Sequence, residues 1–181
     1  MKKILALTTL ALLLAASSAL AQLGGTAPYN TDLHLIVGPE AALRIDTATT
    51  NLTTSATNFT NYGGTTNFTY WVRTTTTGGS GTISLEVTSD FGPSGGPSVK
   101  TPPSGGDALS YAPTVASPGT AASGSQTAST SAGSAVASFG ANAHSPYAGL
   151  TGNAVAWTLT NDPLYQTGTY DATVTFTISV T

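Results

Sequence analysis

Residues that could carry out chemistry are few in this chain, and they do not gather in one stretch of sequence. The two histidines, His34 and His144, lie far apart. Gly92-Pro93-Ser94-Gly95-Gly96 matches the G-x-S-x-G pattern, in which a nucleophilic serine sits on a turn between a strand and a helix. Here a Gly- and Pro-rich loop follows the serine in place of a helix. We therefore interpret both histidines as solvated surface residues and expect no catalytic site.

The eight acidic residues are scattered, and none stands at the D-x-D-x-D-G spacing of a calcium loop. Loop calcium binding by Asp90, Asp107 or Asp162 is an open alternative, although Asp162 before Pro163 is typical of a turn cap. Cysteine is absent, which excludes thiolate metal sites and cysteine catalysis. The sequence thus predicts no metal, no cofactor and no enzyme, while a carboxylate pair brought together by the fold for glycoside hydrolysis stays open.

The N-terminus has the form of a bacterial export signal. Lys2 and Lys3 precede an apolar run over residues 4–16, and Ala19-Leu20-Ala21 fits the small-x-small cleavage rule. We expect residues 1–21 to be a Sec-type signal peptide, and the remainder to be secreted or displayed at the cell surface with no membrane anchor. An uncleaved anchor is the alternative.

Charged side chains are sparse beyond the signal. Arg44, Arg73 and Lys100 are the only basic residues after position 21, whereas all eight acids lie there. Nucleic acids and anionic lipid surfaces require a basic patch, so we exclude both as partners. Threonine is the most frequent polar residue, and its β-branched side chain suits the solvated face of a strand.

Alternation of apolar and polar residues predicts strands throughout the chain. It is clearest over residues 170–181, where every even position is apolar and every odd position is polar. Shorter alternations predict further strands at residues 33–37, 41–46, 67–75, 82–88, 107–115, 136–139 and 155–159. Tyr62-Gly63-Gly64 is expected to form a turn, and the strands at 68–75 and 82–88 are expected to pair as a hairpin.

Short strands separated by turn signals predict an all-β fold, an antiparallel β-sandwich with an Ig-like Greek key; a barrel is the alternative. We expect one domain over residues 22–181, with long Gly/Ser/Pro/Ala-rich loops around residues 92–134. The expected core consists of alternate apolar residues: Leu43, Ile45, Phe68, Tyr70, Val72, Ile83, Leu85, Val87, Val155, Trp157, Leu159, Tyr170, Val174, Phe176 and Ile178.

Two aromatic residues are candidates for ligand binding. Trp71 falls opposite the core face of its strand, and Tyr147 lies near a predicted turn. Exposed aromatic rings can stack on sugar rings or pack against a partner. The alternative is that Trp71 covers a loop or the second sheet.

Two segments resemble the spore coat protein U and chaperone–usher pilin group of bacterial surface proteins. Residues 168–179, GTYDATVTFTIS, are similar to the terminal strand of those subunits. Residues 33–46, interrupted at Gly38-Pro39-Glu40, resemble a donor strand followed by a first strand. The resemblance implies an incomplete Ig-like sandwich whose donor strand fills a groove in a neighbour. It also implies other surface subunits and a periplasmic chaperone as partners. The donor residues would be Leu33, Leu35 and Val37.

We therefore predict a secreted structural protein that assembles with itself, or into a surface appendage, by strand addition. In the terminal strand, core and assembly contacts are expected from Tyr170, Val174, Phe176 and Ile178. The alternative is a stand-alone extracellular module that binds carbohydrate or another surface ligand through Trp71 and Tyr147. In that case Leu33, Leu35 and Val37 pack within their own domain.

Overall fold

The structure is a computed structural model that describes residues 30–54, 58–104 and 108–181. The predicted signal peptide and Asp107 lie outside these residues. The described chain contains nine strands and no helix, and therefore no helix that could cross a membrane. By its contacts the chain divides into Met1–Ile36 and Val37–Thr181, and every strand belongs to the second unit.

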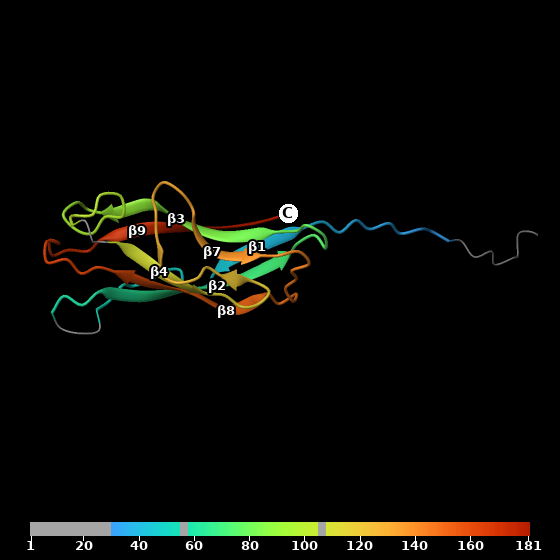
Figure 1. The fold of residues 1–181 in the computed structure, drawn as a ribbon, viewed down its shortest axis with the longest axis horizontal. Helices are drawn as coiled ribbons and strands as arrows, with labels where there is room; N and C mark the ends of the chain where they lie inside the picture. Colours follow the sequence, from blue (N-terminus) through green and yellow to red (C-terminus); the bar gives the residue numbers. More distant parts are fainter. Residues whose placement is uncertain (1–29, 55–57, 105–107) are drawn as a thin grey trace, which may run out of the picture. The chain divides into compact units, whose positions relative to one another are not determined.

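Two antiparallel sheets make up the second unit, which confirms the all-β prediction and matches a sandwich (Figure 1). The first sheet has the order β1 (Glu40–Ile45), β2 (Tyr62–Arg73), β8 (Leu150–Leu159), β4 (Leu109–Thr114) and β6 (Gln126–Thr127). The second has the order β5 (Thr120–Ala121), β7 (Ser134–Phe139), β3 (Gly81–Gly92) and β9 (Asp171–Val180). Pairing is antiparallel throughout both sheets.

The core lies between the sheets and is filled by alternate residues of the central strands. Tyr70 packs on Phe139 with ring centroids 5.2 Å apart, and Tyr111 packs on Trp157 at 5.5 Å. The predicted core residues of β2, β3 and β8 are confirmed as buried: Phe68, Tyr70, Val72, Ile83, Leu85, Val87, Val155, Trp157 and Leu159. Ile45 was predicted wrongly, because it lies at the end of edge strand β1 and is 37% exposed.

The predicted hairpin between residues 68–75 and 82–88 is wrong, because β2 and β3 belong to different sheets. Buried Thr74 directly follows β2, and its hydroxyl donates to Gly140 O and accepts from Ala143 N, both at 2.8 Å. These bonds tie the end of β2 to the segment after β7. The β2–β3 connection therefore crosses from one sheet to the other.

The expected turn at Tyr62-Gly63-Gly64 is also wrong, since these residues begin β2 and pair with the end of β8. Gly64 is needed there for a close approach: a Cβ on it would lie 2.8 Å from Asn51 O. Gly64 thus makes room for the neighbouring segment at residues 50–52, and the chain does not reverse here.

Buried polar side chains attach the Gly- and Pro-containing loop after β4 to the sheets. Tyr70 donates its hydroxyl to Ala116 O at 2.5 Å and accepts from Gly119 N at 3.1 Å. Tyr111, on β4, makes a different link: it donates to Ala135 O of β7 at 2.7 Å and so connects the two sheets. Burial raises the pKa of Tyr70, and it raises the pKa of Tyr111 to about 12, so both hydroxyls remain donors at neutral pH.

Asn153 of β8 is fully buried, and three backbone groups depend on it. Its amide nitrogen donates to Phe68 O at 3.1 Å and to Leu150 O at 2.6 Å, and its oxygen accepts from Ala116 N at 2.8 Å. It sits where the β2–β8 register shifts. The side chain therefore satisfies backbone groups that the irregular ladder leaves without strand partners.

Hydroxyl groups pair with one another on the outer face of the β3–β9 ladder. Thr88 and Thr175 hydroxyls lie 2.9 Å apart, and those of Thr82 and Ser179 lie 3.2 Å apart. These side chains alternate along each strand with the apolar side chains that face the core. The solvated face of this sheet is thus built from short neutral side chains.

Replacing Asn153 by leucine should destabilise the fold strongly. Leucine removes the partners of three backbone groups near the core, so we expect unfolding free energy to fall by about 3 kcal/mol or more. Urea denaturation measures the change. The control is Asn161→Leu, which removes a single exposed bond to Thr60 O and should cost less than about 1 kcal/mol. Equal losses in the two variants would contradict this role of Asn153.

Candidate assembly edge

Residues 33–37 do not form the predicted strand; residues 30–39 have no regular secondary structure, and the first strand begins at Glu40. Leu33, Leu35 and Val37 are 94%, 81% and 58% exposed. A five-residue segment has no ladder unless a sheet edge accepts it, which explains the missing strand.

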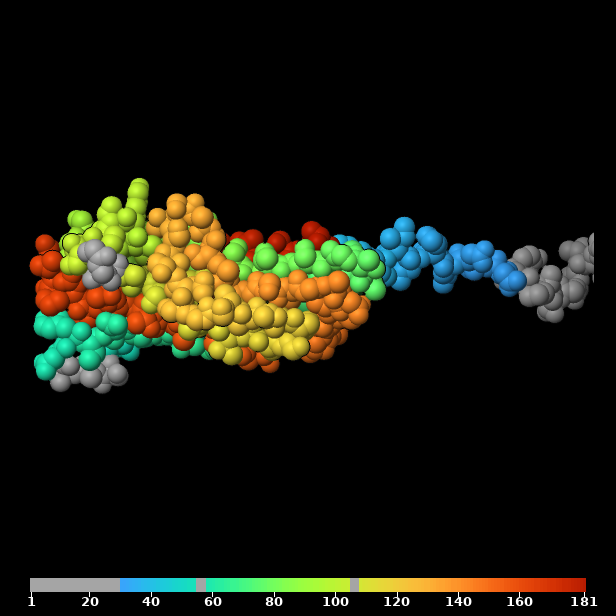
Figure 2. Space-filling model, viewed as in Figure 1, coloured from blue at the N-terminus to red at the C-terminus, as the bar shows by residue number. Residues whose placement is uncertain are grey.

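The predicted terminal strand is confirmed as β9, but its inner face is only half-buried. Ala172, Val174, Phe176, Ile178 and Val180 pack against the core and remain partly accessible. Phe176 contacts Phe68 with ring centroids 6.0 Å apart. β9 reaches the surface in the space-filling view, in red beside β3 (Figure 2). The strand pairs on one side only, with β3, among the described residues.

β1 is the matching edge of the first sheet. It pairs only with β2 within the described chain and contacts β9 across the sandwich. Its inward side chains Ala41 and Leu43 are also half-buried. We call the combined half-buried face of the two strands the β1–β9 seam, made of Ala41, Leu43, Ala172, Val174, Phe176, Ile178 and Val180.

β9 ends beside the start of β1. Thr181 donates its amide to Ser80 O at 2.8 Å, and its carbonyl accepts from Thr75 N at 3.3 Å. Thr75 follows the end of β2, where Arg73 pairs with Glu40, the first residue of β1. The two strands of the seam therefore run in opposite directions.

Tyr170 was expected to act with the terminal strand, and it lies just before β9. Its hydroxyl donates to Gln166 O at 2.8 Å. Its ring lies against Gly96, where an added Cβ would come within 2.2 Å of a ring carbon. Tyr170 thus connects two loops at the start of β9 and is not part of the seam.

The two candidate ligand aromatics meet at one loop on the first sheet. Trp71 donates its indole N–H to Tyr147 O at 3.0 Å, and its ring leaves no room for a side chain at Gly149. The expectation that Trp71 covers a loop is therefore confirmed. The Arg44 guanidinium lies 5.6 Å from the Trp71 ring centroid. The Tyr147 side chain is fully exposed.

Polar groups border this aromatic pair. Arg44 Nε lies 2.7 Å from Asp46 Oδ1, and the Thr69 hydroxyl donates to Asp46 Oδ2 at 2.7 Å. The hydrogen bonds from Thr69 and Arg44 lower the pKa of Asp46. An anionic acceptor and a cation thus lie on the same surface as Trp71.

Asp90 organises the loop after β3. Its carboxylate accepts hydrogen bonds from Ser98 Oγ at 2.6 Å and from the amides of Phe91, Val99 and Lys100 at 2.7 to 3.0 Å. Burial alone would raise the pKa of Asp90, but these four bonds outweigh it and lower the pKa. Both oxygens are engaged by donors, so the carboxylate acts as a loop clamp.

Asp162 is confirmed as a turn cap. Its Oδ1 accepts from Leu164 N at 2.8 Å, its backbone carbonyl accepts from Tyr165 N at 3.0 Å, and Ser104 Oγ donates to Oδ2. In the described ranges no three acidic or histidine side chains come close enough to hold a metal ion. The third calcium candidate, Asp107, is outside those ranges.

The remaining candidates do not converge. His34 lies in the exposed segment before β1, while exposed His144 forms a backbone bridge with Arg73. Ser94 follows β3 in a loop without helix. This loop lines a shallow pocket of about 440 Å³ together with Leu164 and Gln166. The two loop segments lie side by side at one end of the sandwich (Figure 2).

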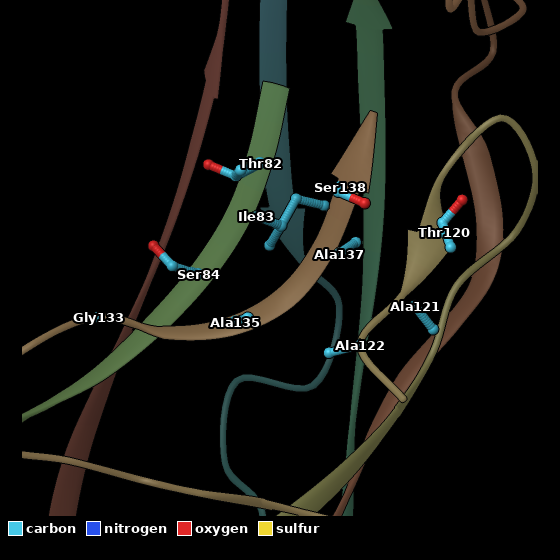
Figure 3. A pocket seen from close by; sticks show the side chains of 10 residues that line it. All are labelled: Thr82, Ile83, Ser84, Thr120, Ala121, Ala122, Gly133, Ala135, Ala137 and Ser138. Atoms are coloured by element: carbon cyan, nitrogen blue, oxygen red, sulfur yellow. The ribbon is translucent and has the colours of Figure 1, made fainter. Parts of the chain in front are cut away.

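A second depression, of about 320 Å³, lies over β3, β5 and β7 (Figure 3). Its lining is made of small apolar residues and hydroxyls, including Ala135, Ala137, Thr82, Thr120 and Ser138. None of its lining side chains carries a charge or titrates near neutral pH. It therefore offers hydrogen bonds and small contacts but no acid–base chemistry. Its residues come from three strands, so no local pattern could reveal it.

No known family model, curated protein or solved structure matches this chain.

Asp90 should make stability depend on pH in the acid range. Because its folded-state pKa is lowered, its contribution is complete above the unfolded value of 3.8 and is lost as pH falls through the folded value. Thermal unfolding of wild type and Asp90→Asn should therefore differ most at neutral pH and converge in acid. Asp171→Asn, at the exposed start of β9, is the control. A gap between wild type and Asp90→Asn that persists in acid would refute the clamp.

Proposed function

We propose that this protein is a non-enzymatic structural subunit that assembles by strand addition. Residues 33–37 of one copy add to the free edge of β9 in another copy and cover its β1–β9 seam. One observation carries the proposal: an exposed segment with apolar residues at every second position coexists with an edge whose apolar face is half-buried. Each supplies what the other lacks.

Strand addition would satisfy the backbone and the side chains together. A free edge presents a row of N–H and C=O groups that a further strand can pair with. Leu33, Leu35 and Val37 would then point to one face, and His34 and Ile36 to the other, because side chains alternate along a strand. The first set would enter the seam, and the second would face solvent.

The energies indicate that the donor residues act together. Burying three aliphatic side chains of this size contributes roughly 5–9 kcal/mol in total. Association costs roughly 4–15 kcal/mol in lost translational and rotational freedom of the two copies. Burial of the three donor side chains alone therefore does not ensure a favourable free energy of association. Burial of the seam residues and the new backbone hydrogen bonds must contribute as well. Loss of one donor side chain should therefore shift assembly visibly.

The strand order supports an Ig-like arrangement with one position open. Constant-type Ig sandwiches place strands A, B, E and D in one sheet and C, F and G in the other. In the order of the first sheet, β1, β2, β8 and β4 would correspond to A, B, E and D. In the second sheet, β3 and β9 would correspond to C and F. Position G, next to β9, has no strand within the described residues. This is the edge to which we assign the donor.

The resemblance to the spore coat protein U and pilin group adds the rest of the proposal. The subunit would be exported through its signal peptide and act at the bacterial cell surface. Its partners would be copies of itself or other surface subunits. A periplasmic chaperone would cover the β9 edge before assembly, since an exposed apolar edge invites aggregation.

Leu35→Asn should weaken assembly, whereas Ile36→Asn should not. The two residues are similarly exposed in the single chain, at 81% and 82%, but face opposite sides of a strand. Losing about 2 kcal/mol at Leu35 should raise the concentration needed for assembly roughly 30-fold. Light scattering coupled to size exclusion measures this. Equal effects of the two substitutions, or no effect of either, would remove the support for strand addition.

A second candidate function is glycan binding at the aromatic pair, which the full exposure of the Tyr147 ring favours. An exposed ring beside hydrogen-bonding groups suits sugar stacking. Trp71 is unsuited as a test residue, because its indole N–H holds the loop.

Tyr147→Ala should therefore be the informative variant if glycans bind here. We expect retention on immobilised polysaccharide to fall about tenfold while the melting temperature stays unchanged. Tyr165→Ala, in the loop before β9, is the control. Unaltered retention in Tyr147→Ala, or no retention of wild type, would dismiss this candidate.

A further inference from the structure

The chain between residues 33–37, the proposed donor segment, and β1 is short, and the Arg73 side chain binds it. Only Gly38 and Pro39 separate Val37 from Glu40, where β1 begins. Arg73, opposite Glu40 in the ladder, donates from Nε to Gly38 O at 2.8 Å and from a terminal nitrogen to Glu40 Oε2 at 2.8 Å. One guanidinium thus holds the chain on both sides of Pro39.

We propose that this junction prevents residues 33–37 from entering the seam of their own chain, and so commits them to a second copy. The inference rests on the proposed strand addition and names the device that directs the segment to a second copy. The device consists of Gly38, Pro39 and the Arg73 side chain.

Turn geometry provides the first argument. To reach its own seam, the segment would have to reverse direction within Gly38-Pro39, as a two-residue hairpin. Such hairpins use type I′ or II′ turns, which require a positive φ at the first central residue and, in type I′, at the second as well. Proline has a fixed negative φ, which excludes type I′. The φ of Gly38 lies outside the left-handed region, so the junction is not in the type II′ conformation either.

The Arg73 contact opposes a change to the type II′ turn. Rotating Gly38 to a positive φ would reorient its peptide groups, including the carbonyl that accepts from Arg73. The same guanidinium is paired with Glu40, the first residue of β1. The contact is solvent-exposed, so it biases the direction of the chain, while Pro39 supplies the larger restriction.

Strand direction provides the second argument. β1 begins at the end of the sandwich where β9 ends, and the two run in opposite directions. A segment folded back from β1 would therefore run parallel to β9. A segment from a second copy is free to run antiparallel to β9, which is the slightly more stable pairing. Both arguments favour addition between chains.

The test is to make the junction at Gly38-Pro39 longer and more flexible. Replacing Pro39 by glycine and inserting about four Gly and Ser residues after Gly38 allows a longer hairpin loop. The donor then competes as an intramolecular strand at high effective concentration. We expect the protein concentration needed for assembly to rise about 100-fold or more, leaving a monomer. The control is the same insertion after Gly124, a loop position with positive φ and open space around it, which should assemble as wild type does.

A second substitution distinguishes a closed monomer from a damaged one. Adding Leu35→Asn to the junction variant should lower its melting temperature, because its own seam is then filled by Leu35. In wild-type monomers at high dilution, the same substitution should leave the melting temperature unchanged. A junction variant whose melting temperature does not respond to Leu35→Asn overturns the inference.

The two proposals fail in different ways. If wild type assembles, Leu35→Asn weakens that assembly and the junction variant still assembles normally, the inference is wrong and strand addition stands. If wild-type assembly does not respond to Leu35→Asn, strand addition is wrong and the inference fails with it. Gly38→Ala provides a further check, since a Cβ there meets nothing within 4 Å and disfavours a positive φ. It should assemble as wild type does.

Discussion

The pairing of β9 with a strand on one side only is the constraint on which the rest of this structure depends. β3 covers one edge of β9, and the other edge is free within the described chain. The inner face of β9 is therefore half-buried along its whole length, and so is the face of β1 across from it. Among the described residues, the largest fully buried side chains lie on β2, β3, β4, β7 and β8.

The same constraint explains the chemistry of the surface. A half-buried apolar edge invites unwanted pairing, and charges on that edge would oppose it. This chain has few charges, so its outer face uses threonine and serine hydroxyls that pair across the β3–β9 ladder. Short neutral side chains keep the face solvated without repelling another neutral strand.

The strands could be predicted where burial follows a period of two. β9, β8, β4 and β1 were visible in the sequence because alternation is a local property of the chain. The β2–β3 hairpin was predicted wrongly, since these strands pair with other strands and the end of β2 is bonded through Thr74 to residues 140–143. These are distant in sequence. The turn at Tyr62-Gly63-Gly64 was also predicted wrongly, because Gly64 allows a close approach to Asn51, a contact that the local pattern does not indicate.

For the candidate edge, the sequence located both components but not their relation. Leu33, Leu35 and Val37 carry the alternation of a strand, yet nothing local indicates that none of the described strands pairs with them. The contact of Arg73 with Gly38 and Glu40 joins residues more than thirty positions apart. The loop clamp at Asp90 was equally hidden, because a carboxylate that accepts from backbone amides leaves no motif.

The position of β1 directly after Pro39 has a mechanical consequence. A pull along the strand axis on the chain before Glu40 is transmitted first to the ladder between β1 and β2, with pairs from Glu40–Arg73 to Ile45–Phe68. Force along antiparallel strands loads their hydrogen bonds in shear, so they resist together and do not open one after another. β1 has six residues, whereas β9 has ten. Of these two strands, β1 would therefore be the first to detach under tension, because its ladder with β2 is the shorter one.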